Sequence, residues 1–182
     1  MSRFFGDIAQ LGIVVRDADK AMTEWAQRLG VGPFYVIRDV EIQNFKYRGA
    51  PSPAPRLTFG FANSGNLQIE IIQQHNDVPS AYRDFLGSGH EGAQHVASWF
   101  SAPAAYDLKR QQLLDQGLEL IHEGATVGGI ARFAYFSTDL PGAMMIELSE
   151  ARLPVLRPML DIVESSATNW DGADPIRSFS TT

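Results

Sequence analysis

The chain has 182 residues, of which 45% are hydrophobic and 20% are charged, as is typical of a globular protein with one compact domain of about 150 residues and an extension. Its formal net charge of −6 argues against nucleic acid as the main partner. It contains no cysteine, which excludes disulfide bonds and thiolate metal ligands, and no apolar run approaches the roughly 20 residues of a membrane span.

The first half of the chain predicts one helix and four strands. Residues 9–15, rich in Ile and Val, predict a buried strand. A helix is expected at 18–29, and its apolar face repeats at helical spacing through Ala18, Met22, Trp25 and Leu29. Further strands are expected at about 34–41, 56–62 and 67–73, with a proline-rich loop at 48–55 and a hairpin turn at 63–66 between them.

The second half repeats this order. After a connector at 77–92 with a short helix around 80–86, the sequence predicts a strand at 93–100 and a helix at 103–116. Strands follow at about 118–122, 131–137 and 143–149, with turns at 128–129 and 140–142. Each half therefore has the order strand–helix–strand–strand–strand. This predicts a single α+β domain at 1–150 built from two modules, about 8–76 and 92–150.

Residues 151–182 form a C-terminal extension of different character. A short amphipathic helix is expected at about 158–166. Several apolar side chains would dock on the domain or on a partner, namely Leu160, Ile162, Val163, Trp170, Ile176 and Phe179. We therefore expect the extension to be ordered and to serve assembly or closure of a pocket.

Four residues with metal-ligand side chains occupy matching positions in the two modules. Gln10 and His95 lie in the first strand of each half, and Glu70 and Glu147 lie in the last. A lone Glu within an apolar strand is unusual, because burying an unpaired charge costs free energy. A duplicated module can bring four such side chains to one centre, so the repeat predicts a metal site.

Three stretches of the chain resemble the vicinal oxygen chelate superfamily, the fold of glyoxalases, methylmalonyl-CoA epimerases, extradiol dioxygenases and bleomycin-resistance proteins. The strand and helix from Gln10 to Phe34 are similar to the first module of that family. The stretch GHEGAQHVA at 89–97 is similar to the epimerase-type opening of the second module, and 139–148 resembles its closing strand. The resemblance covers residues 8–150 and implies two βαβββ modules whose curved mixed sheet surrounds a metal site.

The resemblance assigns the metal positions to Gln10, Glu70, His95 and Glu147. This Gln–Glu–His–Glu set is similar to the one that some glyoxalase I enzymes use for zinc, whereas methylmalonyl-CoA epimerases tend to have Gln at the position of Glu70. The dioxygenase site of two histidines and one carboxylate is incomplete here, because position 10 is Gln. We expect a divalent metal, with Zn²⁺ preferred and Ni²⁺, Co²⁺ or Mn²⁺ as alternatives.

Two carboxylates neutralise a dication, and four side chains around an ion that takes six ligands leave two positions for vicinal oxygens of a substrate. The ion then acts as a Lewis acid while a carboxylate removes a proton next to a carbonyl. We assign that role to Glu147, with Glu70 as the second acid or base. The sequence thus predicts a metal-dependent isomerase, epimerase or lyase of the glyoxalase type. The alternatives are a non-catalytic, resistance-type binding protein and a ring-cleaving dioxygenase.

Other candidate residues have two interpretations each. A set of aromatic side chains forms candidate walls of a substrate pocket or ordinary core, namely Phe59, Phe61, Trp99, Phe133 and Tyr135. A basic set either clamps the acidic groups of a carrier such as glutathione or coenzyme A or forms a solvated sheet edge, namely Arg38, Lys46, Arg48 and Arg56. Acidic neighbours favour the solvated edge. His75, His90 and His122 are expected in solvated loops or strand ends.

We expect a small-molecule substrate and neither a nucleic-acid nor a membrane partner. The N-terminus has no recognisable signal peptide and the chain has no cysteine, which fits a cytoplasmic protein. Two-module chains of the family commonly pair, so the resemblance implies a homodimer. The residues do not identify the substrate, because one fold of this kind hosts many reactions.

Overall fold

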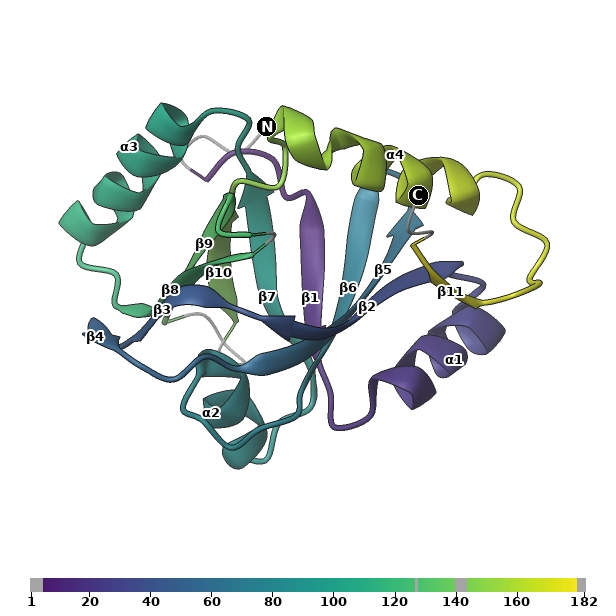
Figure 1. Cartoon of the computed structure of the whole chain (residues 1–182), viewed down its shortest axis with the longest axis horizontal. Helices are drawn as coiled ribbons and strands as arrows, with labels where there is room; N and C mark the ends of the chain where they lie inside the picture. Colours follow the sequence, from purple (N-terminus) through teal and green to yellow (C-terminus); the bar gives the residue numbers. More distant parts are fainter. Residues whose placement is uncertain (1–4, 127, 140–143, 180–182) are drawn as a thin grey trace.

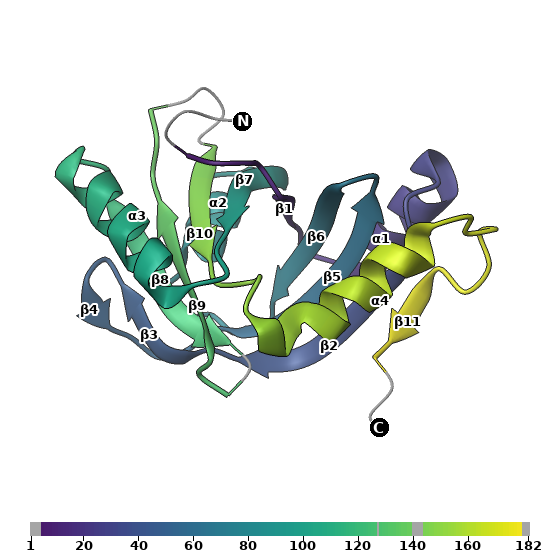
Figure 2. The ribbon, with the colours of Figure 1, turned by 90° about the horizontal axis from the view of Figure 1, so that it is seen from above.

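The computed structural model describes residues 5–126, 128–139 and 144–179. In these ranges, eleven strands form one curved sheet that does not close into a barrel, and helices pack around it (Figures 1 and 2). The sheet is mixed, because some neighbouring strands pair parallel and others antiparallel. The predicted α+β class and the curved mixed sheet are therefore confirmed.

The two halves of the chain contribute four strands each, in the same order. From the centre outwards, the first half supplies β1 (Gln10–Val14), β6 (Leu67–Gln74), β5 (Arg56–Ser64) and β2 (Phe34–Glu41). The second half supplies β7 (Gly92–Trp99), β10 (Met145–Ser149), β9 (Ala131–Phe136) and β8 (Leu120–Thr126). β1 and β7 pair antiparallel at the centre, and each is parallel to the last strand of its own half. The first and last strands of both modules are therefore neighbours.

A further strand of the first half pairs with the outermost strand of the second half, β8. After β2, the single buried residue Ile42 leads into β3 (Gln43–Tyr47), which pairs with β8. β3 then pairs with β4 (Ala50–Pro51), inside the stretch predicted as a loop. The loop prediction is thus wrong at these two residues, which add a short edge strand where proline is tolerated. Because β2 and β3 lie near opposite ends of the sheet, this segment runs across the open side of the curve (Figure 1).

Helix α1 (Ala18–Leu29) packs on the outer face of the first half (Figure 1). It begins after Asp17, whose side chain accepts a hydrogen bond from a backbone N–H of the first turn, and it ends at Gly30, with φ of 65°. Met22 is fully buried against the sheet. Leu29, predicted on the same apolar face, is 62% exposed, because it lies in the last turn beyond the packed residues.

Two further helices match their predictions. α3 (Pro103–Asp115) packs on the outer face of the second half, with Tyr106 and Leu113 buried. The connector forms α2 (Ala81–Gly87), which Ser80 caps. The predicted turn at 140–142 lies outside the described residues. None of the helices in the described ranges has the length and apolar character needed to cross a membrane.

Strand β6 shows how polar side chains such as that of Glu70 can lie within an apolar strand. Ile69 and Ile71 pack with Met22 beneath α1, on the outer face. Because neighbouring residues along a strand point to opposite faces, Gln68, Glu70 and Ile72 face the concave side. Ile72 accordingly belongs to the apolar cluster of that side. Both faces are covered, which explains the near-continuous burial of β6.

The C-terminal extension is ordered and docked on the domain over the residues described, 151–179. After one 3₁₀ turn (Pro154–Leu156), α4 (Arg157–Ala167) lies along β5, and Val163 packs into the concave-side cluster with Phe59 and Phe61 (Figure 2). The strand β11 (Ile176–Ser178) then pairs with β2 at the edge of the sheet. Ile162, which was expected to dock, is 43% exposed because it faces away from the sheet on the same helix.

The extension is also anchored by Trp170 against Gly32. A Cβ at Gly32 would lie 2.7 Å from two ring carbons of Trp170, so any larger residue there would displace the ring. The indole Nε1 donates to Ala173 O at 2.7 Å. Trp170 therefore packs the segment between α4 and β11 against the domain.

A chain truncated after Arg152 is expected to melt at a lower temperature than the full chain. Truncation removes the buried side chains Leu160 and Val163, each of which contributes about 1.5–3 kcal/mol of burial free energy. It also exposes the edge of β2. Circular dichroism melting curves would measure the effect. In the full-length chain, Val163→Ala should lower the melting temperature and Ile162→Ala should leave it unchanged. Equal melting temperatures for the full chain, the truncated chain and both variants would contradict docking of the extension on the domain.

Candidate metal centre

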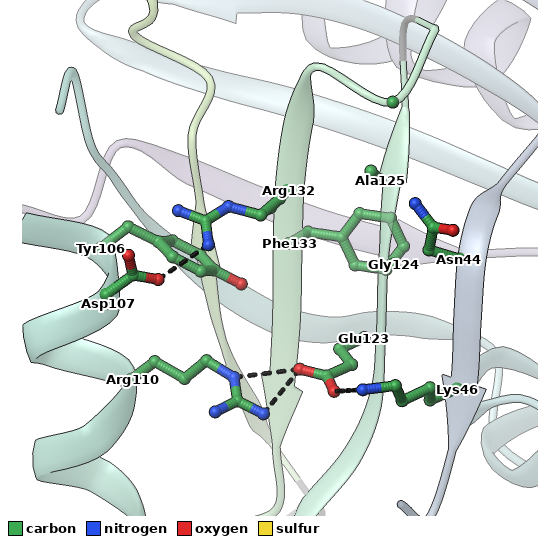
Figure 3. Close-up of a pocket in the computed structure, with 11 residues that line it drawn as sticks. Asn44, Lys46, Tyr106, Asp107, Arg110, Glu123, Gly124, Ala125, Arg132 and Phe133 are labelled. Carbon is green, nitrogen blue, oxygen red and sulfur yellow. Dashed lines mark hydrogen bonds and ion pairs between the residues drawn. The ribbon is translucent and has the colours of Figure 1, made fainter. Parts of the chain in front are cut away.

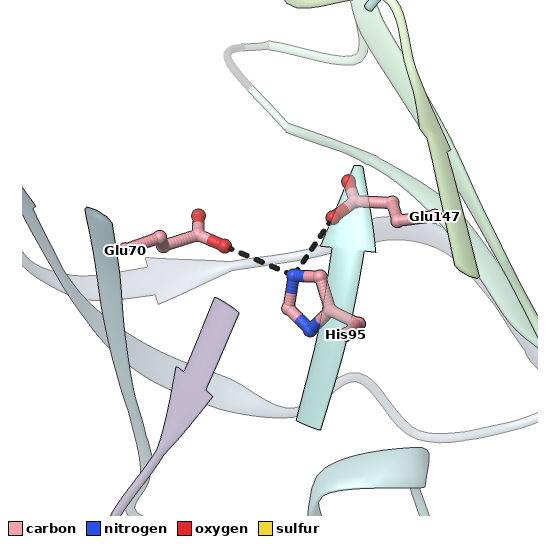
Figure 4. Close-up of side chains that lie close together, drawn as sticks. All are labelled: Glu70, His95 and Glu147. Atoms are coloured by element: carbon pink, nitrogen blue, oxygen red, sulfur yellow. Dashed lines mark ion pairs between the residues drawn. The ribbon is translucent and has the colours of Figure 1, made fainter. Parts of the chain in front are cut away.

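Glu70, His95 and Glu147 converge on the concave side of the sheet, from three of its four central strands (Figure 4). One potential ligand atom of each lies within 4.8 Å of the others. His95 Nε2 is 3.1 Å from Glu147 Oε2 and 3.5 Å from Glu70 Oε2. Three of the four predicted ligand residues, which lie far apart in the sequence, thus meet at one nitrogen.

The strand register explains this convergence. Gly12 on the central strand β1 pairs with Glu70 on one side and with His95 on the other. Gln10 lies two residues before Gly12 on β1 and pairs with Gln68 and Ala97. Ala97 in turn pairs with Glu147 on β10. Gln10 therefore shares the face of the other three. Its Nε2 donates to Gln68 Oε1 at 2.8 Å, so Oε1 is the atom of Gln10 suited to a metal.

Gly12 is needed at the centre of this arrangement. A Cβ at this position would lie 1.8 Å from Cε1 and 2.0 Å from Nε2 of His95. The imidazole ring thus occupies the volume that any other side chain would fill. With glycine here, the ring can lie across β1 toward Glu70.

A bulge next to His95 sets the tautomer of its ring. In the β1–β7 pairing, Gly12 is opposite His95 but Ile13 is opposite Ala93, so Gln94 is the extra residue. Gln94 Nε2 donates to Ala81 O at 2.9 Å, which leaves Oε1 as the acceptor 3.1 Å from His95 Nδ1. An amide oxygen only accepts, so Nδ1 carries a proton, and in the neutral ring Nε2 presents a lone pair. This is the form of histidine that binds a metal.

The residues present fit a cation. Glu70 Oε2 and Glu147 Oε2 are buried and have no partner with hydrogen-bond geometry among the described residues, although His95 Nε2 is close to both. The exposed fractions of the three residues are 7%, 5% and 0% for Glu70, Glu147 and His95. Buried acceptors without donors are costly, and a positive ion at their centre would satisfy all of them.

Without a metal, the surroundings shift the pKa of both Glu70 and His95. Burial raises the pKa of Glu70 to about 7 against the opposing effect of the nearby His95, and the charge of Glu147 adds to the rise. Burial alone would lower the pKa of His95, but its interactions with Glu147 and Glu70 outweigh this and raise it to about 9. A proton and a divalent cation thus compete for the same acceptors.

Four of the five aromatic residues singled out in the sequence lie in one concave-side cluster, namely Phe59, Phe61, Phe133 and Tyr135. Tyr135 reaches the triad, with its hydroxyl 3.3 Å from His95 Nε2. Trp99 lies on the strand of His95, where the Arg152 guanidinium carbon is 5.8 Å from its ring centroid. Their role as pocket walls remains a prediction.

His122 is not solvated, contrary to expectation. It is 1% exposed, and its ring packs against Tyr82 and Tyr135 with centroid distances of 4.9 and 4.3 Å. β8 runs to residue 126 and is covered by β3, so His122 lies within the strand between Tyr47 and Tyr135. Burial lowers its pKa to about 3, which keeps the ring neutral. His75 and His90 are exposed, as predicted.

The basic residues form no clamp in this structure. Each has an acidic partner at the surface: Arg38 with Asp19, Lys46 with Glu123, Arg48 with Asp84 and Glu119, and Arg56 with Asp39. This arrangement supports the solvated-edge interpretation.

A pocket of about 280 Å³ lies between α3 and strands β3, β8 and β9, and it contains none of the triad (Figure 3). Its cations are also paired, because Lys46 and Arg110 contact Glu123 while Arg132 contacts Asp107. The pocket therefore offers no free charge to an anionic ligand.

Sequence reasoning missed two neighbours of the triad. Gln94 was not singled out, because strand periodicity places it opposite to His95 and only the bulge turns it toward the ring. Tyr82, on the short helix α2, donates to Tyr135 at 3.1 Å. No local pattern in the sequence connects that helix to the site.

Comparison with known proteins agrees with this fold. The model of the Glyoxalase/Bleomycin resistance protein/Dioxygenase superfamily matches residues 9–136, well over half of the chain. A search of curated proteins found no match.

Solved structures share the fold at low sequence identity. The methylmalonyl-CoA epimerase from Mycobacterium tuberculosis superposes with a TM-score of 0.58 at 19% identity, over 87% of this chain and 95% of that one. A variant of the Streptomyces coelicolor methylmalonyl-CoA epimerase, in complex with 2-nitronate-propionyl-CoA, gives 0.53 at 17% identity, over 78% and 92%. A hypothetical protein from Bacillus halodurans gives 0.53 at 15% identity, over 79% and 92%. The family match and the common fold together show that the chain belongs to the glyoxalase/bleomycin resistance protein/dioxygenase superfamily.

Proposed function

We propose that this protein is a metal-dependent isomerase, epimerase or lyase that removes a proton next to the carbonyl of a substrate chelated through two vicinal oxygens. One observation carries the proposal: two buried carboxylates and an imidazole nitrogen converge within 4.8 Å, and both carboxylates have an oxygen without a hydrogen-bond partner among the described residues. Membership of the superfamily supports metal-dependent chemistry, but one fold hosts several reactions. Zn²⁺ is the ion we expect first, followed by Ni²⁺, Co²⁺ and Mn²⁺.

Each residue of the centre has a role in this proposal. Glu70, His95 and Glu147 would hold the ion, and Gln10 would add its amide oxygen. When bound, the ion would act as a Lewis acid toward the two substrate oxygens and stabilise negative charge on them. Glu147 would then take the proton: the C–H bond breaks, its electron pair moves toward the carbonyl oxygen, and the proton rests on the carboxylate. Return of a proton from Glu147 or Glu70 to the other face or to the adjacent carbon completes the reaction.

The proposal is tested by hydrogen exchange in deuterium oxide. Metal-loaded protein is incubated with a panel of α-hydroxy ketones, α-hydroxy aldehydes and thioesters, and NMR follows the hydrogen next to each carbonyl. At least one compound should exchange or isomerise with the protein and not with the metal alone. Binding without exchange across the panel would favour the non-catalytic alternative, and stoichiometric consumption of oxygen would favour the dioxygenase.

We further propose that residues 1–150 are the catalytic domain, that 151–182 are its extension, and that the protein acts in the cytoplasm as a homodimer. The resemblance to the superfamily, whose two-module chains commonly pair, supports the dimer. Light scattering at micromolar concentration should therefore give a mass about twice the 20.1 kDa of the chain. A single species of 20.1 kDa would contradict the dimer.

A further inference from the structure

Two buried tyrosine hydroxyls form a chain that ends at the triad. Tyr82 on α2 donates to the hydroxyl of Tyr135 on β9 at 3.1 Å, and that hydroxyl is 3.3 Å from His95 Nε2. Both side chains are 2% exposed, and their rings meet edge to face with centroids 5.6 Å apart. A tyrosine hydroxyl both donates and accepts hydrogen bonds, so each of these groups can pass its O–H on to the next acceptor.

The position of Tyr135 aims its hydroxyl at the reacting centre. Tyr135 pairs with Glu147 across β10 and β9, and with His122 on its other side. Its side chain therefore shares the concave face with the carboxylate that we assign as the base. Tyr82 is the donor in its contact with the Tyr135 hydroxyl, and the contact of that hydroxyl with the triad is to His95 Nε2.

Occupation of the triad changes what the Tyr135 hydroxyl can do. In the neutral form of His95, Nδ1 donates to Gln94, so Nε2 carries a lone pair, and the Tyr135 hydroxyl faces this nitrogen. A cation held by Nε2 and the two carboxylates would use that lone pair. The O–H of Tyr135 would then need another acceptor in a buried place, where an unpaired hydroxyl is costly.

We propose that Tyr135 is a further catalytic residue, which donates a hydrogen bond to the chelated substrate oxygen that gains negative charge, and that Tyr82 positions it. This inference rests on the proposed function. A neutral donor aimed at developing charge stabilises the transition state more than the ground state, because the bond strengthens as the charge grows. Tyr82 orients Tyr135 by occupying one lone pair of its oxygen, which directs the proton toward the centre.

The test uses acetohydroxamate, an anion that chelates metals through two vicinal oxygens, and the Co²⁺-loaded protein, whose visible absorption reports ligand binding. Tyr135→Phe should weaken acetohydroxamate binding roughly 10–100-fold, the range for a hydrogen bond to a charged group. Its affinity for Co²⁺ should change less than about threefold, since Tyr135 is not a metal ligand. Tyr82→Phe should show a smaller loss of acetohydroxamate binding, because the Tyr135 donor remains but is less well oriented.

Tyr106→Phe is the matched control, since Tyr106 is equally buried but lies on α3, which packs on the outer face of the sheet. It should bind Co²⁺ and acetohydroxamate as the wild type does. Wild-type acetohydroxamate affinity in folded Tyr135→Phe would overturn the role of Tyr135 and leave the proposed function intact. Loss of Co²⁺ from Tyr135→Phe would also overturn it, by making Tyr135 part of the metal site. A wild type that binds no metal would overturn the proposed function itself.

Discussion

The wild-type protein is expected to carry one divalent metal ion per chain, and His95→Ala is expected to carry almost none. His95 supplies the single nitrogen toward which both carboxylates of the triad point, at 3.1 and 3.5 Å. Without the imidazole, two adjacent buried carboxylates remain, and one of them takes a proton rather than sharing a cation. Elemental analysis of protein grown with Zn²⁺, Ni²⁺, Co²⁺ and Mn²⁺ would measure the metal content directly.

Melting curves give an independent measure of the same site. A ligand present at 100 times its dissociation constant stabilises the folded state by about 2.7 kcal/mol. Removal of metal by a chelator should therefore lower the melting temperature of the wild type and leave that of His95→Ala unchanged. His90→Ala is the control, because His90 is exposed and contacts Ser88 rather than the triad. If the wild type contains no metal and none of the four ions changes its melting temperature, the proposed metal centre is wrong.

Glu147→Gln is expected to slow exchange of the substrate hydrogen by roughly 10²–10⁴-fold, the usual contribution of a positioned general base. Glutamine has the shape of glutamate and keeps an oxygen for the metal, but its amide does not accept a proton at neutral pH. The measurement is the NMR exchange rate in deuterium oxide with metal-saturated protein. Metal content must be determined in parallel, so that loss of the ion is separated from loss of the base.

Glu41→Gln serves as the control for this substitution, because Glu41 lies exposed at the end of β2. It should exchange substrate at the wild-type rate. If Glu147→Gln keeps full activity, the base is another group, and Glu70→Gln becomes the variant to measure. Equal losses in both variants with metal retained would mean that the two carboxylates share the proton transfers.

Much of the fold could be predicted because it follows local patterns. Helix α1 matches its predicted bounds, 18–29, since an apolar stripe, an acidic N-cap and a terminal glycine agree at one place. Prediction was poorer where pairing depends on distant segments. Strand β3 was missed because its partner, β8, is more than seventy residues away in the sequence. Within β3, only Phe45 is buried, and so short an alternation does not identify a strand.

The candidate site, too, could be predicted in part from local sequence patterns and depends in part on contacts between distant segments. The sequence by itself determined the repeated module and the polar positions Glu70, His95 and Glu147, because a charged residue inside an apolar strand needs a reason that local structure cannot supply. Only the tertiary structure decided that Gly12 makes room for the His95 ring and that a bulge places Gln94 against His95 Nδ1. It also decided that the hydroxyls of Tyr82 and Tyr135 form a hydrogen-bonded chain that ends at His95. The physical reason is that burial and hydrogen-bond partners belong to the packed chain. His122 looks the same in the sequence as the exposed His90, and only the strand laid over it makes it a buried, neutral ring.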